Sequence, residues 1–242
     1  MKLILVGYGS MGKRVAALAE ERGYEIAGVV IPENHEAPYP IYHDFKDLPE
    51  ADAIIDFSHP DLTLEMLSTE EVTIPIIIAT TGSKEEITKQ AKLKAENQPV
   101  FFSPNMSYGV HVMTKIVQLA TELLEDYDIE LLEKHHNQKV DAPSGTLNLL
   151  LDTIQDVQFR KDSEAIYNRH DRSEKRDEKE IGVSAIRGGT IVGEHDVFFA
   201  GLDEEITISH RAQSKDIFAN GALQVVPKLV RKETGFYTFD NL

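Results

Sequence analysis

Apolar runs alternate with amphipathic stretches along residues 1–103. The apolar runs lack polar alternation, which predicts strands buried on both faces of a sheet, over residues 3–6, 25–31, 53–57, 74–80 and 100–103. Between them, apolar positions three and four apart predict helices over residues 11–22, 63–68 and 84–97. Strands that alternate with helices indicate a parallel sheet with helices on both faces. This part of the chain is therefore predicted to be α/β.

The pattern changes in the second half of the chain. Amphipathic helices are predicted over residues 110–126 and 146–156, with a strand over residues 129–135 between them. Strands over residues 181–187, 190–199 and 204–212 are joined by short glycine or acidic turns, which is typical of an antiparallel or mixed sheet. A last helix, over residues 217–230, precedes a tail, residues 235–242. The second half is therefore predicted to be α+β.

Composition narrows the classes of function. The net charge of −16 argues against an extended surface for nucleic acid or anionic lipid, since both bind basic patches. The absence of cysteine excludes disulfides, thiolate metal sites and cysteine nucleophiles. No apolar run approaches the roughly 18 residues of a membrane helix, and the first strand leads into glycines without a signal-peptide cleavage site. We therefore expect a cytoplasmic protein that binds neither nucleic acid nor membranes.

One segment carries many charged residues but no net charge. Residues 160–180 carry seven basic and seven acidic residues. Alternating charges of this kind usually belong to solvated surface. We interpret the segment as solvated and mobile.

A glycine-rich turn follows the first predicted strand and opens the first helix. Gly7 permits the tight turn, Gly9 lets a pyrophosphate approach the backbone, and Gly12 lets the helix pack closely. The helix N-terminus offers free N–H groups to the same anion. This context predicts a Rossmann-like dinucleotide site, while a glycine-rich turn without a ligand remains the alternative. The residues of the turn are Gly7, Tyr8, Gly9, Ser10, Met11 and Gly12.

The residues that would select NADH or NADPH give no single answer. The second strand ends without an acid for a ribose 2′-hydroxyl, but Glu33 lies near the usual spacing after Gly12. Lys13 and Arg14, at the helix start, are candidates for a 2′-phosphate contact or are simply surface charges. We therefore predict that both nucleotides are accepted, within about an order of magnitude, or about 1.4 kcal/mol of binding free energy.

Three further loops follow predicted strands. They cover residues 56–60, 80–82 and 103–109. Each on its own is compatible with an ordinary turn. Because open α/β sheets bind ligands at the carboxyl ends of their strands, three polar turns on one edge favour a cofactor cleft.

The segment 135–146 carries the most informative chemistry. A zinc site is disfavoured, because adjacent histidines on a strand point to opposite faces and no second ligand cluster is evident. A histidine or lysine can instead provide a proton while a helix N-terminus binds a carboxylate. A polar loop with a helix cap remains the alternative. The residues concerned are His135, His136, Lys139, Asp141, Ser144, Gly145 and Thr146.

These residues resemble the signature of the 4-hydroxy-tetrahydrodipicolinate reductase family, also called dihydrodipicolinate reductases, of the diaminopimelate route to lysine. The segment from Glu133 to Thr146 is the most specific part of the resemblance. Further similar blocks follow in the family's order over essentially the whole chain, at residues 56–58, 80–82, 104–107, 109–110, 186–189, 192–195 and 218–222.

The resemblance implies two domains. Residues 1–106 and 216–242 would form a Rossmann-like, parallel-sheet nucleotide-binding domain, and residues 107–215 an α+β domain that binds substrate and builds a homotetramer. The implied reaction is the NADPH- or NADH-dependent reduction of 4-hydroxy-tetrahydrodipicolinate, a cyclic dicarboxylate, to tetrahydrodipicolinate. It involves no metal.

The resemblance also implies roles for single residues. His135 would be the proton donor and Lys139 a second donor. Because a lysine titrates near pKa 10.4 in water, about four units above histidine, His135 is the better acid and Lys139 is expected mainly to bind a carboxylate. The substrate binders would be His136, Ser144, Gly145 and Thr146. Besides the glycine-rich turn, the nucleotide contacts would be Ala79, Thr80, Thr81, Ser103, Pro104, Asn105, Met106 and Lys215.

The chain departs from the family pattern in three places. A longer glycine-rich loop that contains an arginine is absent, Ala79 stands where glycine is usual, and an acid–arginine pair after the second strand is missing. These departures concern cofactor preference and not the reaction. Two alternatives stay open: another two-domain NAD(P)-dependent dehydrogenase of a small carboxylate, and a nucleotide sensor without catalysis.

Overall fold

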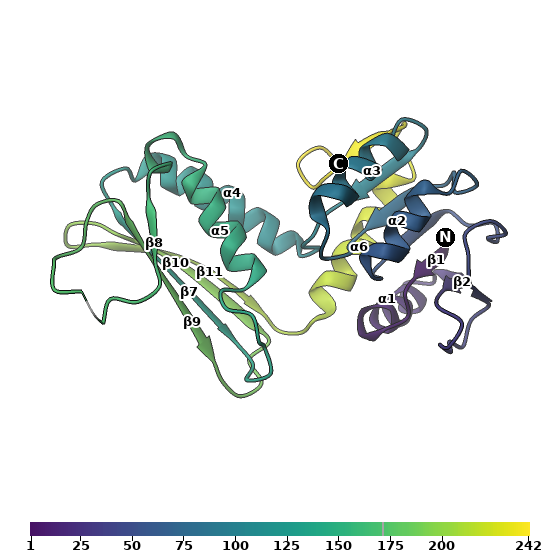
Figure 1. Ribbon diagram of the computed structural model, residues 1–242, viewed down its shortest axis with the longest axis horizontal. Helices are drawn as coiled ribbons and strands as arrows, with labels where there is room; N and C mark the ends of the chain where they lie inside the picture. Colours follow the sequence, from purple (N-terminus) through teal and green to yellow (C-terminus); the bar gives the residue numbers. More distant parts are fainter. Residues whose placement is uncertain (171) are drawn as a thin grey trace. The chain divides into compact units, whose positions relative to one another are not determined.

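The computed structural model describes residues 1–170 and 172–242 of the protein (Figure 1). The chain divides into two compact units. The first consists of Met1–Ser107 and Asp216–Leu242, and the second of Tyr108–Lys215. Each unit has its own sheet and its own buried clusters of apolar side chains.

The first unit contains a parallel sheet of seven strands in the order β12-β6-β5-β4-β1-β2-β3. The chain adds strands on one side of β1 and then returns to add β4 on the other side. The β1–β4 boundary is therefore the switch point at which open α/β sheets bind ligands. The strands are β1 (Lys2–Val6), β2 (Glu25–Val30), β3 (Ile41–Tyr42), β4 (Ala53–Asp56), β5 (Ile76–Ile78), β6 (Pro99–Phe102) and β12 (Gly235–Tyr237).

Helices cover both faces of this sheet, because its strands are apolar on both sides. In β1, Leu5 packs in the cluster that contains Val15 and Leu223, on the side of α1 and α6. Its neighbour Ile4 packs in the opposite cluster, on the side of α2 and α3. The helices are α1 (Ser10–Glu21), α2 (Pro60–Ser68), α3 (Lys84–Lys94) and α6 (Asp216–Leu229).

The second unit contains a mixed sheet of five strands in the order β11-β10-β7-β9-β8. β7 pairs parallel with β9 and antiparallel with β10. Two helices, α4 and α5, lie on one face of the sheet (Figure 1), where Leu131 and Leu150 share a buried cluster. The elements are α4 (Tyr108–Leu123), β7 (Asp128–His135), α5 (Gly145–Gln155), the 3-10 helix η1 (Gln158–Arg160), β8 (Glu164–Ile166), β9 (Glu180–Arg187), β10 (Gly193–Ala200) and β11 (Glu205–Ala212).

The predicted fold class, a Rossmann-like α/β part with a second α+β part, is confirmed. The hydrophobic pattern missed three short strands. β12 lies in the predicted tail, where Phe236 pairs with Val100 of β6. β3 and β8 have two and three residues, so neither is long enough to show a period of its own. Pairing with a neighbouring strand, and not local pattern, makes these segments strands.

The interpretation of residues 160–180 as solvated holds for most of their described part, which is exposed, but it is wrong for Arg160 and Glu180. Arg160 is 5% exposed and donates to three main-chain carbonyls at 2.7 to 3.1 Å. Glu180 is equally buried and pairs with Arg169 and Arg172. The two buried charges are therefore satisfied, Arg160 by main-chain carbonyls and Glu180 by two arginines. Residue 171, which the interpretation also covered, lies outside the described residues.

A membrane-spanning helix would need both length and continuous apolarity. Among the residues that the structure describes, no helix has both.

Candidate active site

The chemistry-bearing residues of the second unit meet at one edge of its sheet. β7 ends at His135, which pairs with Arg187 at the end of β9. On the other side of β7, β10 places His195 opposite Glu133. Paired residues project from the same face of a sheet, so the four side chains gather on the face that α5 covers.

Glu133 lies at the centre of this group and is fully buried. Its Oε2 accepts a hydrogen bond from Nδ1 of His135. Its Oε1 accepts from Nη2 of Arg187 at 2.7 Å and from the Ser144 N–H at 3.2 Å. Burial alone would raise the pKa of Glu133, but the hydrogen bonds and charges of Arg187 and His135 outweigh it and hold the pKa below its ordinary value. The carboxylate is therefore charged at neutral pH.

Two imidazole rings pack edge to face beside this carboxylate. The ring centroids of His135 and His195 are 5.2 Å apart at an interplanar angle of 74°. Burial, followed by the charge of His135, lowers the pKa of His195 to about 4. Burial also lowers the pKa of His135, as do the charges of Lys139 and Arg187, while the hydrogen bond and charge of Glu133 oppose this. His195 is therefore a neutral partner at pH 7.

Ser144 links His195 to the start of α5. Its Oγ accepts from the Leu147 N–H at 3.2 Å, which caps the helix, and lies 3.0 Å from Nε2 of His195. Nδ1 of His195 is buried and has no hydrogen-bond partner among the described residues. Because a buried N–H without an acceptor is rarer than an unused acceptor, we assign the ring proton to Nε2, which donates to Ser144. Neither of these two contacts then uses the hydroxyl proton of Ser144, whose side chain is buried.

Lys139 lies in the loop between β7 and α5 and already has a partner. Its Nζ is 2.8 Å from both carboxylate oxygens of Asp141, and this contact lowers the pKa of Asp141. The N–H of Lys139 donates to the carbonyl of His136 at 3.1 Å. Arg187 donates to the carbonyl of Asp141 at 2.6 Å, which fixes this loop to β9. An anionic ligand of Lys139 must therefore compete with Asp141.

The glycine-rich turn of the first unit lies at the switch point of its sheet. Gly7 has a φ of +84°, and a Cβ there would lie 2.9 Å from Cα of Ser58. A Cβ at Gly12 would clash with the carbonyl oxygen of Gly7. At Gly9 a Cβ would meet no described atom within 4 Å, so the backbone is open to a ligand. No side chain of the described residues caps α1, so its first N–H groups suit the pyrophosphate of a dinucleotide.

Two further candidate loops lie on the same edge, after β5 and β6, because the strands are parallel. Thr81 and Pro104 are exposed, and Ser103 and Asn105 are half-buried. The other three candidates, Ala79, Thr80 and Met106, are each at most 5% exposed. The exposed members form the surface of the edge, and the buried members support it.

Asp56 supports this edge from beneath. It is fully buried at the end of β4 and accepts at Oδ1 from the N–H and the hydroxyl of Ser58, at 2.8 and 2.6 Å. Its Oδ2 forms a triangle with the hydroxyl oxygens of Thr63 and Thr80, with edges of 2.6, 3.0 and 2.8 Å. Burial raises the pKa of Asp56, although these hydrogen bonds oppose it. A protonated carboxyl supplies the third hydrogen that a triangle of three oxygens needs, which agrees with this direction.

The remaining candidates for nucleotide contact are charged residues. Nζ of Lys13 lies 5.9 Å from the centroid of the Tyr8 ring. Arg14 pairs with an aspartate at the start of α6, so its charge is already compensated. Glu33 is exposed shortly after β2. Lys215 is the last residue of the second unit.

Three residues of the cluster had no role in the sequence interpretation: Glu133, Arg187 and His195. Their positions belong to the blocks that carried the resemblance, but only the strand register brings them together. No second ligand cluster is evident in the sequence, but the fold brings the possible ligand atoms of Glu133, His135 and His195 within 4.8 Å of one another. Both oxygens of Glu133 already accept hydrogen bonds, which suits proton handling better than metal binding.

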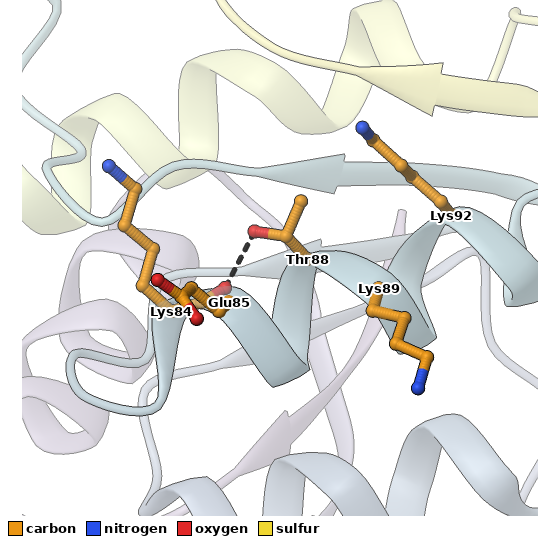
Figure 2. Close-up of a pocket in the computed structure, with 5 residues that line it drawn as sticks. All are labelled: Lys84, Glu85, Thr88, Lys89 and Lys92. Carbon is orange, nitrogen blue, oxygen red and sulfur yellow. Dashed lines mark hydrogen bonds between the residues drawn. The ribbon is translucent and has the colours of Figure 1, made fainter.

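A separate hollow lies on the outer face of α3 (Figure 2). Its walls are Lys84, Glu85, Thr88, Lys89 and Lys92. The lysine side chains spread away from one another, and the Thr88 hydroxyl donates to the main-chain carbonyl of Lys84 at 2.6 Å. None of the five residues is buried. Flexible, exposed lysines of this kind do not define a ligand, and we assign it none.

Comparison with known proteins bears on both units. The sequence matches the profile of the dihydrodipicolinate reductase N-terminus over residues 1–106 and that of its C-terminus over residues 109–242. A 4-hydroxy-tetrahydrodipicolinate reductase of Staphylococcus carnosus (strain TM300) is 55% identical, over 100% of this chain and 99% of that protein. One of Staphylococcus haemolyticus (strain JCSC1435) is 56% identical, over 100% of both chains.

A solved structure extends the comparison to the fold. The dipicolinate-bound dihydrodipicolinate reductase from Paenisporosarcina sp. TG-14 has a TM-score of 0.76 and covers 98% of this chain and 97% of its own. At 20% sequence identity, this likeness concerns the fold.

Proposed function

The chain belongs to the dihydrodipicolinate reductase family, and we propose that its two units divide one reduction, the first binding a nicotinamide nucleotide and the second a cyclic dicarboxylate. The activity of the family is the reduction of 4-hydroxy-tetrahydrodipicolinate, so the chain is an oxidoreductase of lysine biosynthesis. The observation that carries the division of roles is the joining of His135, Glu133 and the Ser144 turn at one sheet edge.

We propose that the nucleotide-binding domain is the first unit. The open backbone at Gly9 and the uncapped start of α1 suit a pyrophosphate. Thr81 and Pro104 are exposed on the same edge, while Thr80 and Met106 support it from within. The nucleotide, when bound, supplies a hydride, that is, two electrons and one hydrogen nucleus. The Paenisporosarcina relative has dipicolinate, a dicarboxylate, bound in its structure.

We propose that the second unit binds the substrate carboxylates. A protein of charge −16 needs local cations and N–H groups to hold a dianion. Lys139 provides the cation, and the start of α5 provides N–H groups and the Ser144 hydroxyl proton. Gly145, Thr146 and His136 complete the proposed substrate site.

We propose His135 as the proton donor. Hydride addition leaves the product one proton short, and the proton goes to a ring carbon or to the leaving oxygen. A bound dianion favours the protonated imidazole, which counters the lowering of its pKa by burial. Lys139 is paired with Asp141 and serves mainly to hold a carboxylate.

Self-association as a homotetramer is part of the proposal. Apolar side chains line one exposed side of α4: Val112 is 38% exposed, Ile116 48%, Leu119 55% and Leu123 73%. Contiguous apolar surface of this kind usually marks an interface. A cytoplasmic location stays a prediction from the sequence.

Turnover with freshly generated substrate tests the proposal. We expect the protein to oxidise both NADH and NADPH, and His135→Gln to lower kcat by about 10²- to 10⁴-fold with little change in substrate KM. Lys139→Ala should raise substrate KM steeply, since an unpaired carboxylate costs about 2 to 5 kcal/mol. Nucleotide affinity should stay unchanged in both variants.

Distinct results would support the alternatives. Nucleotide binding without oxidation would identify a sensor, and the absence of turnover with this substrate alone would identify a different dehydrogenase. Wild-type kcat in folded His135→Gln protein would eliminate His135 as the donor.

The choice of nucleotide is a separate prediction. Arg14 is compensated and Glu33 is exposed, so no single contact dominates. We expect kcat/KM values for NADH and NADPH within about tenfold, or about 1.4 kcal/mol. A ratio above about a hundredfold, or about 2.8 kcal/mol, would contradict this.

A further inference from the structure

We propose that Glu133 is the positioning residue of this site: its carboxylate orients the ring of His135, fixes the proton on Nδ1 and links the ring to the turn at Ser144. This inference rests on the proposed function, in which His135 gives the proton and the turn binds a substrate carboxylate.

The contacts of Glu133 leave it little freedom. The side chain is fully buried, one oxygen accepts from His135, and the other accepts from Arg187 and from the Ser144 N–H. Arg187 holds the carboxylate from the next strand, where it pairs with His135 in the register. A carboxylate so fixed holds the ring that donates to it in one orientation.

This arrangement determines which ring nitrogen can act. Because Glu133 carries no proton, the hydrogen of the shared bond lies on Nδ1 of His135. Nε2 is then the atom that exchanges a proton with a ligand. The ring has space at this atom because residue 193 is glycine, where a Cβ would lie 3.0 Å from Nε2.

The charged groups around His135 act in opposite directions. Glu133, from β7, favours the protonated ring, whereas Lys139, from the following loop, and Arg187, from β9, disfavour it. His195, from β10, is neutral at pH 7, and Asp141 offsets Lys139. Without the charge of Glu133, the two cations and burial lower the pKa of His135 unopposed. The protonated ring therefore becomes less stable.

The decisive experiment compares Glu133→Gln with Glu133→Asp. We expect Glu133→Gln to lower kcat by about 10²-fold or more, as the loss of an orienting carboxylate does elsewhere. The alkaline limb of the kcat profile should move to lower pH. Glu133→Asp keeps the charge and should recover part of both losses, with nucleotide affinity unchanged throughout.

Glu130→Gln is the matched control. Glu130 lies on the same strand, on the opposite face, and pairs with Arg176. The same change of charge there should leave kcat within about twofold of wild type, as for most substitutions away from a site. A kcat within about twofold of wild type in Glu133→Gln, with an unmoved alkaline limb, would overturn the proposal.

A second readout needs no turnover. In NMR titrations of the imidazole nitrogens, the wild-type protein should show His135 protonated at Nδ1, and Glu133→Gln should show a lower pKa for His135. If the protonation site and the pKa of His135 are the same in Glu133→Gln as in wild type, the positioning role is overturned, whatever the activity of the variant. If Glu133→Gln does not fold, the wild-type ring still tests the proposal: a neutral His135 that carries its proton on Nε2 and not on Nδ1 would overturn it. Absence of turnover in wild type would instead contradict the proposed function alone.

Zinc alone tests the competing use of these side chains. Calorimetric titration of wild-type protein with zinc chloride should give no stoichiometric binding at this group. Binding of one zinc per chain that Glu133→Gln abolishes would overturn the positioning role in favour of a metal site formed by Glu133, His135 and His195.

Discussion

Asp56 ends β4 in the first sheet, and Glu133 lies near the end of β7 in the second. Both carboxyl groups are fully buried and both hold neighbouring loops in place. Their partners differ. Among the described residues, Asp56 receives only hydroxyl and N–H donors, whereas Glu133 receives an arginine and a histidine.

The pKa directions follow from these partners. No cation among the described residues compensates Asp56, so burial raises its pKa, whereas Arg187 and His135 lower the pKa of Glu133 in spite of burial. The raised pKa makes Asp56 harder to ionise beneath the edge where we propose that a pyrophosphate binds. The charged Glu133 in the second sheet contacts His135, the proposed proton donor. The same functional group therefore fits the proposed anion site in one unit and the proposed proton donor in the other.

The largest expected effect comes from removal of Arg187, the cation that pairs with Glu133. Arg187→Met leaves a buried charge without its partner, so we expect the free energy of unfolding at pH 7 to fall by about 3 to 5 kcal/mol. Urea denaturation measures it. Arg211→Met is the control, because Arg211 is 62% exposed and its pair with Glu194 should contribute about 0 to 1 kcal/mol.

A double variant sharpens this test. Glu133→Gln in the Arg187→Met background removes the stranded charge and should restore part of the lost stability. Strictly additive losses would mean that Arg187 stabilises the fold through its main-chain contacts and not through Glu133.

The second effect is a difference in pH dependence. The pKa of Glu133 is lowered in the folded state, so its contribution to stability is present near neutral pH and is lost as the pH falls below its ordinary value. The pKa of Asp56 is raised, so its contribution is present in acid and is lost as the pH rises through the raised value. Each group changes the free energy of unfolding by at most about 1.4 kcal/mol per pH unit.

Unfolding free energies measured against pH separate the two groups. Glu133→Gln should remove a slope that rises with pH, and Asp56→Asn one that falls with pH. If both variants removed a slope of the same sign, the two carboxyl groups would have pKa values shifted in the same direction, which would contradict the comparison.

The smallest effect is expected at Asp56. Asp56→Asn replaces the carboxyl group by an amide of similar shape, which can still accept from Ser58 and donate to Thr63 or Thr80. We expect a loss below about 1 kcal/mol, and nucleotide dissociation constants close to wild type. A loss above about 3 kcal/mol would show that the fold needs a charged carboxylate here.

The sequence predicted what local pattern determines. The β1 strand, its glycine turn and α1 are contiguous, so periodicity and glycine spacing suffice to identify them. The group around Glu133 depends on the pairing of β7 with β9 and β10, which no local pattern contains. The threonines on Asp56 also come from separate elements, α2 and the loop after β5. Residues 160–180 show the same limit, because main-chain carbonyls from other segments bury Arg160, and ion pairs with Arg169 and Arg172 bury Glu180.

The discontinuity of the first unit has a consequence for biosynthesis. β6 pairs with β12, and a Cβ at Gly221 in α6 would clash with the carbonyl of Met106, so the end of the chain packs against segments made much earlier. A ribosome that adds about 5 to 20 residues per second must complete the whole second unit before these partners emerge. The second unit is continuous in sequence, so it can fold during this time. One edge of the first sheet meanwhile stays unpaired for on the order of ten seconds.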